Sequence, residues 1–478
     1  MWTQRDQIQA YQFLRRRLVS ALVSADANHP VSPSRRLVLG TVLGLIATLL
    51  VTAAFGIIGL LRPGTGSDWK KPGQVVIEKE TGTRFILAGD GLLHPVANFA
   101  SARLLAGGDG SKTATVPAKQ LASVSRGAEL GIPGAPDSLP AASRISTGPL
   151  TVCSVAPADQ PVAAAGQTVL RWASALPVRT LPAGRALLVS DGQSRQLISD
   201  GHRFRLSGTG QAAALGFAGQ GAAEVTPAWL SVVPAGGDLD FLTVTGAGQP
   251  GPQLGATRLA IGSVLSVAQP ALPGQASTGS GQFYLVLKAG IASISAVQAQ
   301  LALTDPANRA AGLPGRVVPV GAAQLAGLAT TALPDRLSSG AQLASIPQLV
   351  TLPTGSPICL LLAADGSTEV QVASPSVDVM AGSSPISGGA GGLLADRVLV
   401  PAGTGALVSD RPDGAATTTY LLADDGIKYP ISSPAAVSAL GFGKLSPVVL
   451  TTAVLALVPS GPALDQAAAQ RVVPAGAR

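Results

Sequence analysis

The sequence predicts a single N-terminal transmembrane helix followed by an α+β domain, in which four repeat modules surround a central core with quasi-two-fold symmetry. Three observations lead to this fold class. They are an apolar run from Leu37 to Leu61, segments that recur in the same order along the chain, and two cysteines at corresponding places in two halves. The composition agrees, because 46% of the 478 residues are hydrophobic and only 12% are charged, unlike a disordered chain.

The apolar run predicts a retained membrane anchor at residues 37–61. A helix of these 25 residues crosses the ~30 Å hydrocarbon core of a bilayer. A cleaved signal peptide is one alternative, but its apolar stretch is only about 7–15 residues and ends in a small-x-small site. This run ends at Arg62-Pro63-Gly64 instead. A buried helix of a soluble protein is the other alternative, and such helices seldom stay apolar for so long.

Charge sets the expected orientation of the anchor. The head, residues 1–36, has six arginines against two aspartates, which is +4 of the chain's formal +7. Basic flanks remain cytoplasmic, so we expect a cytoplasmic head, an ectodomain at residues 62–465 on the other side, and a C-terminal tail at residues 466–478. The ectodomain's charges nearly balance, which leaves no electrostatic basis for binding nucleic acid.

The head is expected to form an amphipathic helix. Residues 3–6 (Thr-Gln-Arg-Asp) predict a capping box, and about six helical turns follow. The docking face consists of an apolar stripe, Ile8, Tyr11, Leu14, Leu18 and Leu22, beside Arg15, Arg16 and Arg17. Two roles fit: the arginines lie on anionic headgroups, or the stripe docks on a cytoplasmic partner, which its narrowness favours. Residues 28–34, with two prolines, are the expected hinge.

Two cysteines, Cys153 and Cys359, favour a disulfide, because an even count in an extracytoplasmic domain usually pairs. Two buried free thiols remain the alternative at this point. A metal site needs more ligands than this chain gathers in sequence.

Several phrases recur in the same order in two parts of the ectodomain. The matches are "PAGRALLVSD" (182–191) with "PAGTGALVSD" (401–410), "RQLISDGHRFRL" (195–206) with "YLLADDGIKYPI" (420–431), "ALGF" (214–217) with "ALGF" (439–442), and "LSVVPAGGDLD" (230–240) with "LALVPSGPALD" (455–465). A weaker pair, "FILAGDGLLHPV" (85–96) and "YLVLKAGIASIS" (284–295), completes a set of four.

In each copy an apolar strand runs into a glycine, and in three copies an aspartate precedes it, which is a strong hairpin signal. These turn residues are Asp90, Gly91, Asp200, Gly201, Gly290, Asp425 and Gly426. Apolar stretches at helical spacing follow each hairpin. We therefore expect four α+β modules, placed approximately at residues 80–110, 190–240, 281–335 and 415–464.

No catalytic, cofactor-binding or metal-ligating constellation emerges from the sequence. His29, His94 and His202 lie outside any HExxH motif and are expected on the surface or in turns. A phosphate loop needs Gly-x4-Gly-Lys-Ser/Thr, but "GGDGSKT" (107–113) and "GFGKLS" (441–446) both depart from it. We expect no enzyme activity and no cofactor.

Six segments are specific in combination. They are "QIQAYQFLRRRLVSALVSAD" (7–26), "GIIGLLRPG" (56–64), "GDGLLHPVANFASARLL" (89–105), "GIPGAPDSLP" (131–140), "LTVCSV" (150–155) and "SPICLLL" (356–362). In these segments the chain resembles the EccB family, a membrane component of actinobacterial type VII (ESX) secretion systems.

The resemblance implies a single-pass protein of the inner (plasma) membrane with an elongated periplasmic part, built from a core and four repeats and containing one disulfide. It also implies a hexameric complex with the EccC ATPase, EccD, EccE and other EccB copies, with a mycosin protease as a periplasmic partner. Contact with secreted ESX substrates would be indirect. The expected function is a structural subunit that scaffolds the membrane assembly and its periplasmic vestibule.

Two other functions remain as alternatives. Some family members are labelled ATPases, so one is an ATP-hydrolysing subunit with an unrecognised site. The other is a membrane-anchored cell-wall binding module, which would need a groove of exposed aromatic side chains. Only 4 Trp, 4 Tyr and 9 Phe occur in the chain, which disfavours this module.

Overall fold

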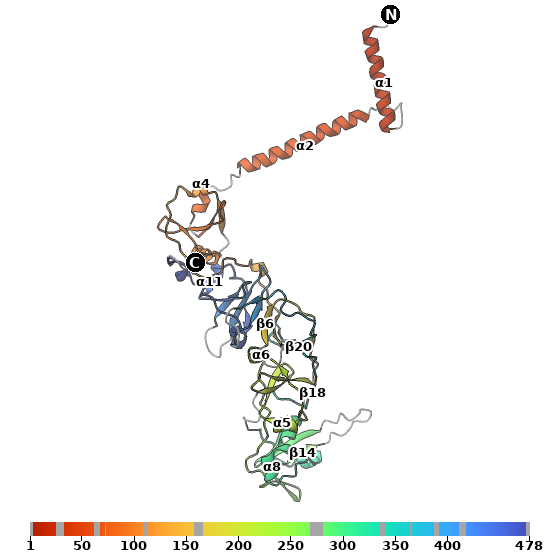
Figure 1. Cartoon of the computed structure of the whole chain (residues 1–478), viewed down its shortest axis with the longest axis vertical. Coiled ribbons are helices and arrows are strands. Elements are labelled where there is room, and N and C mark those ends of the chain that lie inside the picture. The colour runs from red at the N-terminus through yellow and green to blue at the C-terminus, as the bar shows by residue number, and fades with distance from the viewer. Residues whose placement is uncertain are drawn as a thin grey trace.

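The computed structural model describes residues 3–24, 33–61, 67–71, 73–108, 112–156, 166–267, 281–334, 340–363, 365–386, 392–410 and 417–474. Two N-terminal helices lead into an elongated α+β rod, with the first helix at the end of the molecule farthest from the rod (Figure 1).

Helix α1 (Gln4–Ser24) and helix α2 (Pro33–Leu61) correspond to the expected head helix and anchor. The backbone N–H of Thr3 donates to Asp6 Oδ2 over 3.0 Å, which is one half of the expected capping box. We expected a hinge at residues 28–34, and its C-terminal bound was wrong, because Pro33 and Ser34 already belong to α2. Residues 28–32 lie outside the described residues. Proline suits the first helical turn, where its missing N–H has no intrahelical partner.

Four sheets of the rod share one strand order. In each, the first three strands are antiparallel neighbours and the fourth runs parallel to the first. Sheet 1 contains β1 (Val75–Glu78), β2 (Arg84–Leu87), β3 (Leu93–Pro95) and β4 (Thr113–Val116). Sheet 2 contains β8 (Arg185–Ser190), β9 (Arg195–Ser199), β10 (His202–Leu206) and β11 (Ala223–Glu224), with β18 (Gln348–Leu349) added on β8. Sheet 3 contains β14 (Val264–Val267), β15 (Gln282–Leu287), β16 (Gly290–Ile294) and β17 (Val318–Pro319), and sheet 4 contains β23 (Ala406–Asp410), β24 (Thr419–Leu422), β25 (Lys428–Ile431) and β26 (Val448–Leu450).

Helices occupy the same two places around each sheet. Between the third and fourth strands lie α3 (Phe99–Ala106), α5 (Thr209–Ala214), α7 (Ala296–Thr304) with α8 (Pro306–Ala310), and α11 (Pro434–Ala439). After the fourth strand come α4 (Ala118–Leu121), α6 (Pro227–Val232), α9 (Ala322–Leu325) and α12 (Thr452–Ala456). Asn98, Ser295 and Ser433 begin α3, α7 and α11 by accepting a backbone N–H of the first turn, as residues at N-caps do.

A seven-stranded central sheet joins the two ends of the rod. Its order is β21-β22-β6-β5-β19-β20-β7. The bounds are β5 (Leu150–Val155), β6 (Gln167–Trp172), β7 (Val178–Thr180), β19 (Ile358–Leu362), β20 (Thr368–Ala373), β21 (Ser384–Pro385) and β22 (Arg397–Leu399). The remaining elements are the hairpin β12 (Pro250–Leu254)–β13 (Thr257–Ala260), the 3-10 turns η1 (Ser67–Lys70) and η2 (Ala142–Arg144), and α13 (Gln466–Ala469).

Three large apolar clusters fix the order of sheets along the rod. One cluster packs α3 of sheet 1 against β24 and α11 of sheet 4, a second packs sheet 2 against sheet 3, and the third fills the central region around Trp172 and Trp229. Figure 1 shows the resulting order from the anchor outward: sheet 1, sheet 4, central sheet, sheet 2, sheet 3. Sheets 1 and 4, the first and the last in the sequence, are therefore neighbours in space, as are the consecutive sheets 2 and 3.

The sheets begin earlier than the modules expected from the sequence. Strands β1, β8, β14 and β23 each begin before the expected start of their module. Each of them pairs in parallel with a fourth strand that lies more than 30 residues later, and local patterns do not reveal such a pairing. The C-terminal tail is also packed: α13 contacts α3, and Val472 pairs with Leu130.

Candidate functional site

The anchor helix exposes its apolar side chains over the segment Val38–Ile57. The segment Val38–Ile57 of α2 is long and apolar enough to cross a membrane by length and composition. Its side chains include Leu39, Leu43, Leu49 and Leu50, each more than half exposed. An apolar surface of this extent is stable only against lipid or against another apolar surface.

The docking face predicted on α1 is exposed as well. Ile8, Tyr11, Leu14, Leu18 and Leu22 are between 57% and 78% exposed. Arg15, Arg16 and Arg17 are exposed next to this stripe, and the Arg17 guanidinium carbon lies 5.7 Å from the centre of the Phe13 ring. The described chain thus leaves an amphipathic helix whose apolar face remains open.

Three of the predicted turns lie where the sequence placed them. Gly91 and Gly426 have φ of 78°, and Asp90 and Asp425 each accept the backbone N–H two residues later over 2.9 Å. Asp200 and Gly201 form the two-residue turn between β9 and β10, both with positive φ.

Gly290 differs from the prediction, because it is the first residue of β16 and pairs with Leu287 beyond the turn. Its φ is 154°, and an added Cβ would lie 2.0 Å from the Ala329 carbonyl oxygen. The glycine is therefore needed for the close approach of the segment around Ala329, whereas the turn itself is made by Lys288 and Ala289.

The cysteines form a disulfide between neighbouring antiparallel strands. Cys153 of β5 and Cys359 of β19 are directly opposite in the register, their Cα atoms are 4.0 Å apart, and neither residue is exposed to solvent. Val379 packs on the pair. The buried Arg171 guanidinium donates to the carbonyl oxygens of Val379 (2.8 Å) and Ala381 (3.0 Å), and burial lowers the pKa of Arg171.

Rings pressed against glycines recur in three sheets, and sequence reasoning missed them. A Cβ added to Gly127, Gly236 or Gly461 would lie 2.3 Å from the ring of His94, Phe204 or Tyr429, respectively. Each ring belongs to the third residue after the glycine of a hairpin turn. The glycine that the ring contacts comes directly after a residue that forms a parallel β-bridge to the strand carrying the ring. The fixed spacing of an aromatic residue after the turn was a signal that could have revealed this contact.

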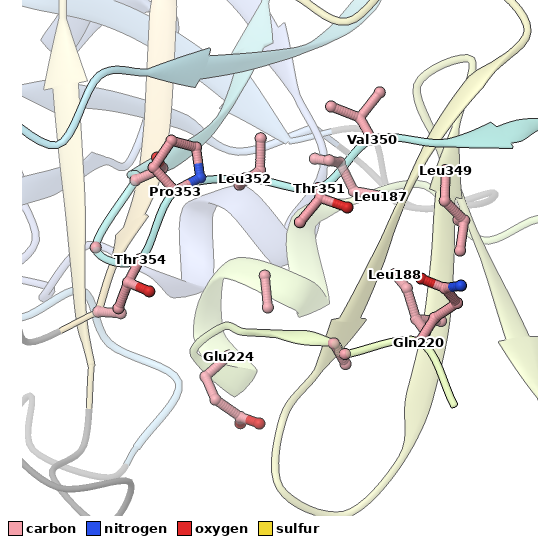
Figure 2. A pocket seen from close by; sticks show the side chains of 16 residues that line it. Leu187, Leu188, Gln220, Glu224, Leu349, Val350, Thr351, Leu352, Pro353 and Thr354 are labelled. Atoms are coloured by element: carbon pink, nitrogen blue, oxygen red, sulfur yellow. The ribbon is translucent and has the colours of Figure 1, made fainter. Parts of the chain in front are cut away.

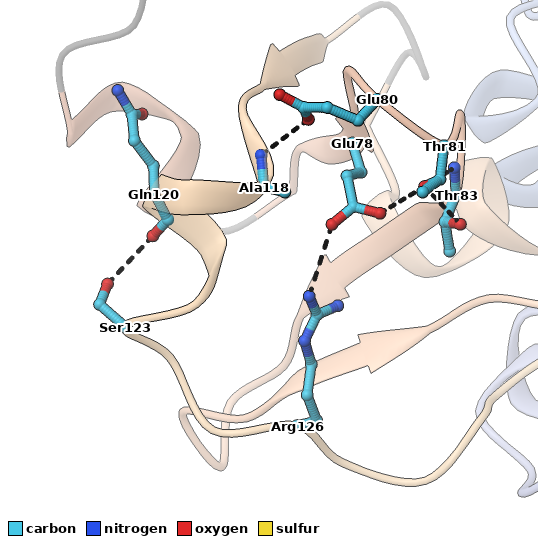
Figure 3. Close-up of polar contacts among 8 residues, drawn as sticks. All are labelled: Glu78, Glu80, Thr81, Thr83, Ala118, Gln120, Ser123 and Arg126. Carbon is cyan, nitrogen blue, oxygen red and sulfur yellow. Dashed lines mark hydrogen bonds and ion pairs between the residues drawn. The ribbon is translucent and has the colours of Figure 1, made fainter.

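Polar contacts join the β1–β2 turn of sheet 1 to neighbouring segments at the end of the rod nearest the membrane helix (Figure 3). Glu78 accepts a hydrogen bond from the Thr81 hydroxyl, and its other oxygen lies 3.7 Å from the Arg126 guanidinium. Glu80 accepts the backbone N–H of Ala118 over 2.8 Å, which joins the β1–β2 turn to the start of α4. These contacts hold the first module together, and their geometry suits a structural role.

A cavity of about 370 Å³ lies between sheet 2 and the linker that enters β19 (Figure 2). Leu187 and Leu188 form part of its wall, at the point where the edge of β8 changes partner from β18 to β11. The linker residues 350–356 cover it. The cavity lies at the boundary between the central apolar cluster, which contains Leu187, and the apolar cluster of sheets 2 and 3, which contains Leu188.

Two polar side chains of β25, the half-buried Lys428 and the buried Tyr429, serve packing. Lys428 Nζ donates to the carbonyl oxygens of Leu455 (2.6 Å) and Val458 at the end of α12, and burial lowers its pKa. Burial and the neighbouring Asp425, which accepts the Tyr429 hydroxyl over 2.6 Å, raise the pKa of Tyr429. Within the described ranges, no group of three or more His, Cys, Asp or Glu could hold a metal ion.

The fold and its one long apolar helix among the described residues define the class: a membrane-anchored protein with an elongated, disulfide-linked α+β rod. A family model described as "Type VII secretion system ESX-1, transport TM domain B" matches residues 1–474. The chain therefore belongs to the EccB family of type VII secretion systems.

Relatives extend over almost the whole chain. "ESX-3 secretion system ATPase EccB3" of Mycobacterium tuberculosis is 28% identical across 97% of this chain and 88% of its own length. "ESX-5 secretion system ATPase EccB5" of Mycobacterium marinum is 26% identical across 97% and 92%.

Solved structures share the fold. A chain from the "intact ESX-5 inner membrane complex" superposes with a TM-score of 0.65 at 23% identity, covering 99% of this chain and 96% of that one. The "EccB3 dimer from the ESX-3 core complex" gives a TM-score of 0.65 at 25% identity, covering 83% and 99%.

Proposed function

We propose that this chain is a structural membrane subunit of a type VII secretion complex, which scaffolds the inner-membrane assembly and its periplasmic vestibule. Membership of the EccB family, together with an anchor helix joining an exposed amphipathic helix to a long rod, carries this proposal. The anchor would hold the head in the cytoplasm and the rod in the periplasm, as the arginine-rich head favours.

The partners follow from the same family. We propose that the chain assembles with EccC, EccD, EccE and other EccB copies, and meets a mycosin protease in the periplasm. A relative solved as an EccB3 dimer supports contact between copies. The exposed stripe of α1, centred on Leu14 and Leu18, is the docking face that we assign to the cytoplasmic side of the complex.

We further propose that the rod consists of four repeats related by a quasi-two-fold axis through the disulfide. The shared strand order of sheets 1 to 4 supports this division. Each half of the chain also pairs with the other half at a matching place. Ile145, which precedes Cys153, pairs with Gly405 at the start of sheet 4. Leu349, which precedes Cys359, pairs with Ala186 of sheet 2. Ala186 and Gly405 are both the fifth residue of the recurring "PAG" phrase, so the two halves make equivalent crossed contacts.

A non-enzymatic role is part of the proposal, although curated relatives carry the word ATPase in their names. The sequence departs from the phosphate-loop pattern at both of its nearest matches. The rod would also lie in the periplasm, away from cytoplasmic ATP. Steady turnover of ATP by the purified full-length chain, lost on a single substitution, would contradict this part.

The docking face can be tested with charge substitutions. Leu14→Glu with Leu18→Glu places two carboxylates on the stripe, where burying them against a partner is costly. We expect the full-length variant to lose the co-purifying subunits in detergent, as seen by blue-native electrophoresis with mass spectrometry. Gln9→Glu with Gln12→Glu adds the same charge on the side of the helix away from Leu14 and Leu18 and serves as the matched control. Equal recovery of partners by both variants would contradict the docking role.

A further inference from the structure

The lysines of this chain gather in the module next to the membrane anchor. Five of its eight lysines fall within a stretch of 50 residues: Lys70, Lys71, Lys79, Lys112 and Lys119. Residues 62–126 carry nine basic side chains against five acidic ones, whereas residues 127–478 carry 18 against 19. The net positive charge of the ectodomain therefore belongs to sheet 1 and the segments that flank it.

The five lysines are exposed, whereas other charged groups of sheet 1 contact the rod itself. Arg84 pairs with Asp137, and the Arg126 guanidinium lies 3.7 Å from Glu78. The carboxylate of Glu80 accepts a backbone N–H at the start of α4 over 2.8 Å (Figure 3). Positive charge directed at solvent in this module is thus carried mainly by lysine ammonium groups.

Packing places two of the lysine-bearing elements side by side. Lys70 is the last residue of η1, and Lys119 lies in α4. Trp69 of η1 and Leu121 of α4 are both buried in one apolar cluster of sheet 1. Figure 1 shows α4 at the end of the rod nearest the anchor helix α2.

Strand β4 connects the remaining lysines to the same region. The carbonyl of Lys112, just before β4, accepts the Val75 N–H at the start of β1 over 3.0 Å. The backbone N–H of Lys79 donates to the Val116 carbonyl at the end of β4 over 3.0 Å. Because four strand residues span only about 10 Å, the lysines before and after β4 lie near one another. Together with Lys70, Lys71 and Lys119 they form one basic face.

The covalent connection keeps the basic face close to the bilayer. Helix α2 ends at Leu61, and η1 begins at Ser67. Six residues of chain span at most about 22 Å in any conformation. The start of η1 is therefore tethered near the headgroups of the leaflet on the rod's side of the membrane, whichever way the anchor is oriented.

We propose that the basic face binds anionic phospholipid headgroups of that leaflet. Lysine ammonium groups donate to phosphate oxygens as compact positive charges, and each lysine close to an anionic surface strengthens binding about fivefold. A single spanning helix leaves the rod free to tilt, and a second attachment beside the anchor restrains the first module. The attraction decays over a Debye length of about 8 Å at physiological ionic strength, so it weakens when salt is added.

Amine footprinting of the full-length chain in lipid nanodiscs tests the basic face. The discs contain phosphatidylcholine alone, or equal parts of phosphatidylcholine and phosphatidylglycerol. Reductive methylation uses uncharged formaldehyde and is read at each lysine by mass spectrometry. We expect methylation of Lys112 and Lys119 to slow about fivefold in the anionic discs at low salt, as one headgroup contact per lysine predicts. The difference should disappear in about 1 M NaCl, where the Debye length is about 3 Å.

Matched variants separate the basic face from charge in general. Lys112→Gln with Lys119→Gln removes two charges from the face, so methylation of Lys70 in anionic discs should return toward its rate in neutral discs. Lys288→Gln with Lys444→Gln removes two exposed charges from sheets 3 and 4, and it should leave the slow methylation of Lys70 unchanged. In the wild type, methylation of Lys288 and Lys444 should proceed equally in both discs.

Three results would overturn the proposal. One is equal methylation of the basic face in neutral and anionic discs. Another is slowing at Lys288 as large as that at Lys112, which would show a general effect of the discs on the reagent. The third is the same slowing when millimolar inorganic phosphate is added to neutral discs, which would assign the basic face to a free anion and not to lipid.

Discussion

At the scale of single residues, close contacts between rings and backbone explain several glycines of this chain. Gly236 and Gly461 carry no positive φ, yet a Cβ would lie 2.3 Å from Phe204 or Tyr429. The requirement is therefore steric, set by a ring from a neighbouring strand, and differs from that of the turn glycines Gly91 and Gly426.

Gly236→Ala should destabilise sheet 2 by about 1–3 kcal/mol, because the new methyl group displaces the buried Phe204 ring. The measurement is the urea dependence of hydrogen exchange in β9 and β10. Gly221→Ala is the matched control, since no atom lies within 4 Å of its Cβ position. Equal stability of the two variants would show that the ring moves aside without cost.

At the scale of elements, the C-terminal helix α13 depends on one carboxylate. Asp465 accepts the Ala468 N–H over 2.8 Å as the N-cap and also accepts the Ser432 hydroxyl over 2.8 Å. The first of these bonds, then the second, lowers the pKa of Asp465. A lowered pKa in the folded state means that stability is present above the ordinary value of 3.8 and is lost as the pH falls through the folded value.

Asp465→Asn should weaken the acid sensitivity of α13, and Asp465→Ala should cost about 1 kcal/mol of helix stability. Hydrogen exchange of residues 466–470, compared between pH 6 and pH 3, measures both effects. Ser432→Ala removes only the second bond and should have the smaller effect. Protection that is unchanged in Asp465→Ala would mean that packing against α3 alone holds the helix.

At the scale of the whole molecule, the disulfide joins the two halves of the chain at the middle of the central sheet. Cys153 and Cys359 are 206 residues apart in sequence. On one side of their strands lie β6, β22 and β21, and on the other lie β20 and β7. The covalent crosslink thus lies at the centre of the rod, in the sheet that connects its two ends.

Cys153→Ala with Cys359→Ala should lower the stability of the central region by about 2–5 kcal/mol, because the unfolded chain regains the entropy of a long loop. Trp172 and Trp229 both lie in the central cluster, whereas Trp69 lies in the cluster of sheet 1. Fluorescence during denaturation in urea therefore reports on the central region when Trp2→Phe and Trp69→Phe are present in both proteins compared. Sheets 1 and 3 should retain their hydrogen-exchange protection under mild conditions. An unchanged fluorescence midpoint would show that strand pairing alone holds the halves together.

The sequence by itself determined the anchor, the head helix, the hairpins and the family. Each of these depends on local periodicity, on turn chemistry or on short motifs, and local patterns of that kind survive without knowledge of the fold. The phrase match between residues 182–191 and 401–410 also indicated that two parts of the chain correspond.

Only the tertiary structure decided which parts lie together. Sheet 1 packs on sheet 4 and sheet 2 on sheet 3. In each of these four sheets the first strand pairs with a distant fourth strand, and the Ala128 carbonyl meets His94 from 34 residues away. These contacts follow from parallel pairing and from burial of apolar faces between separate segments. Both depend on the position of the whole chain in space, which neighbouring residues in the sequence do not encode.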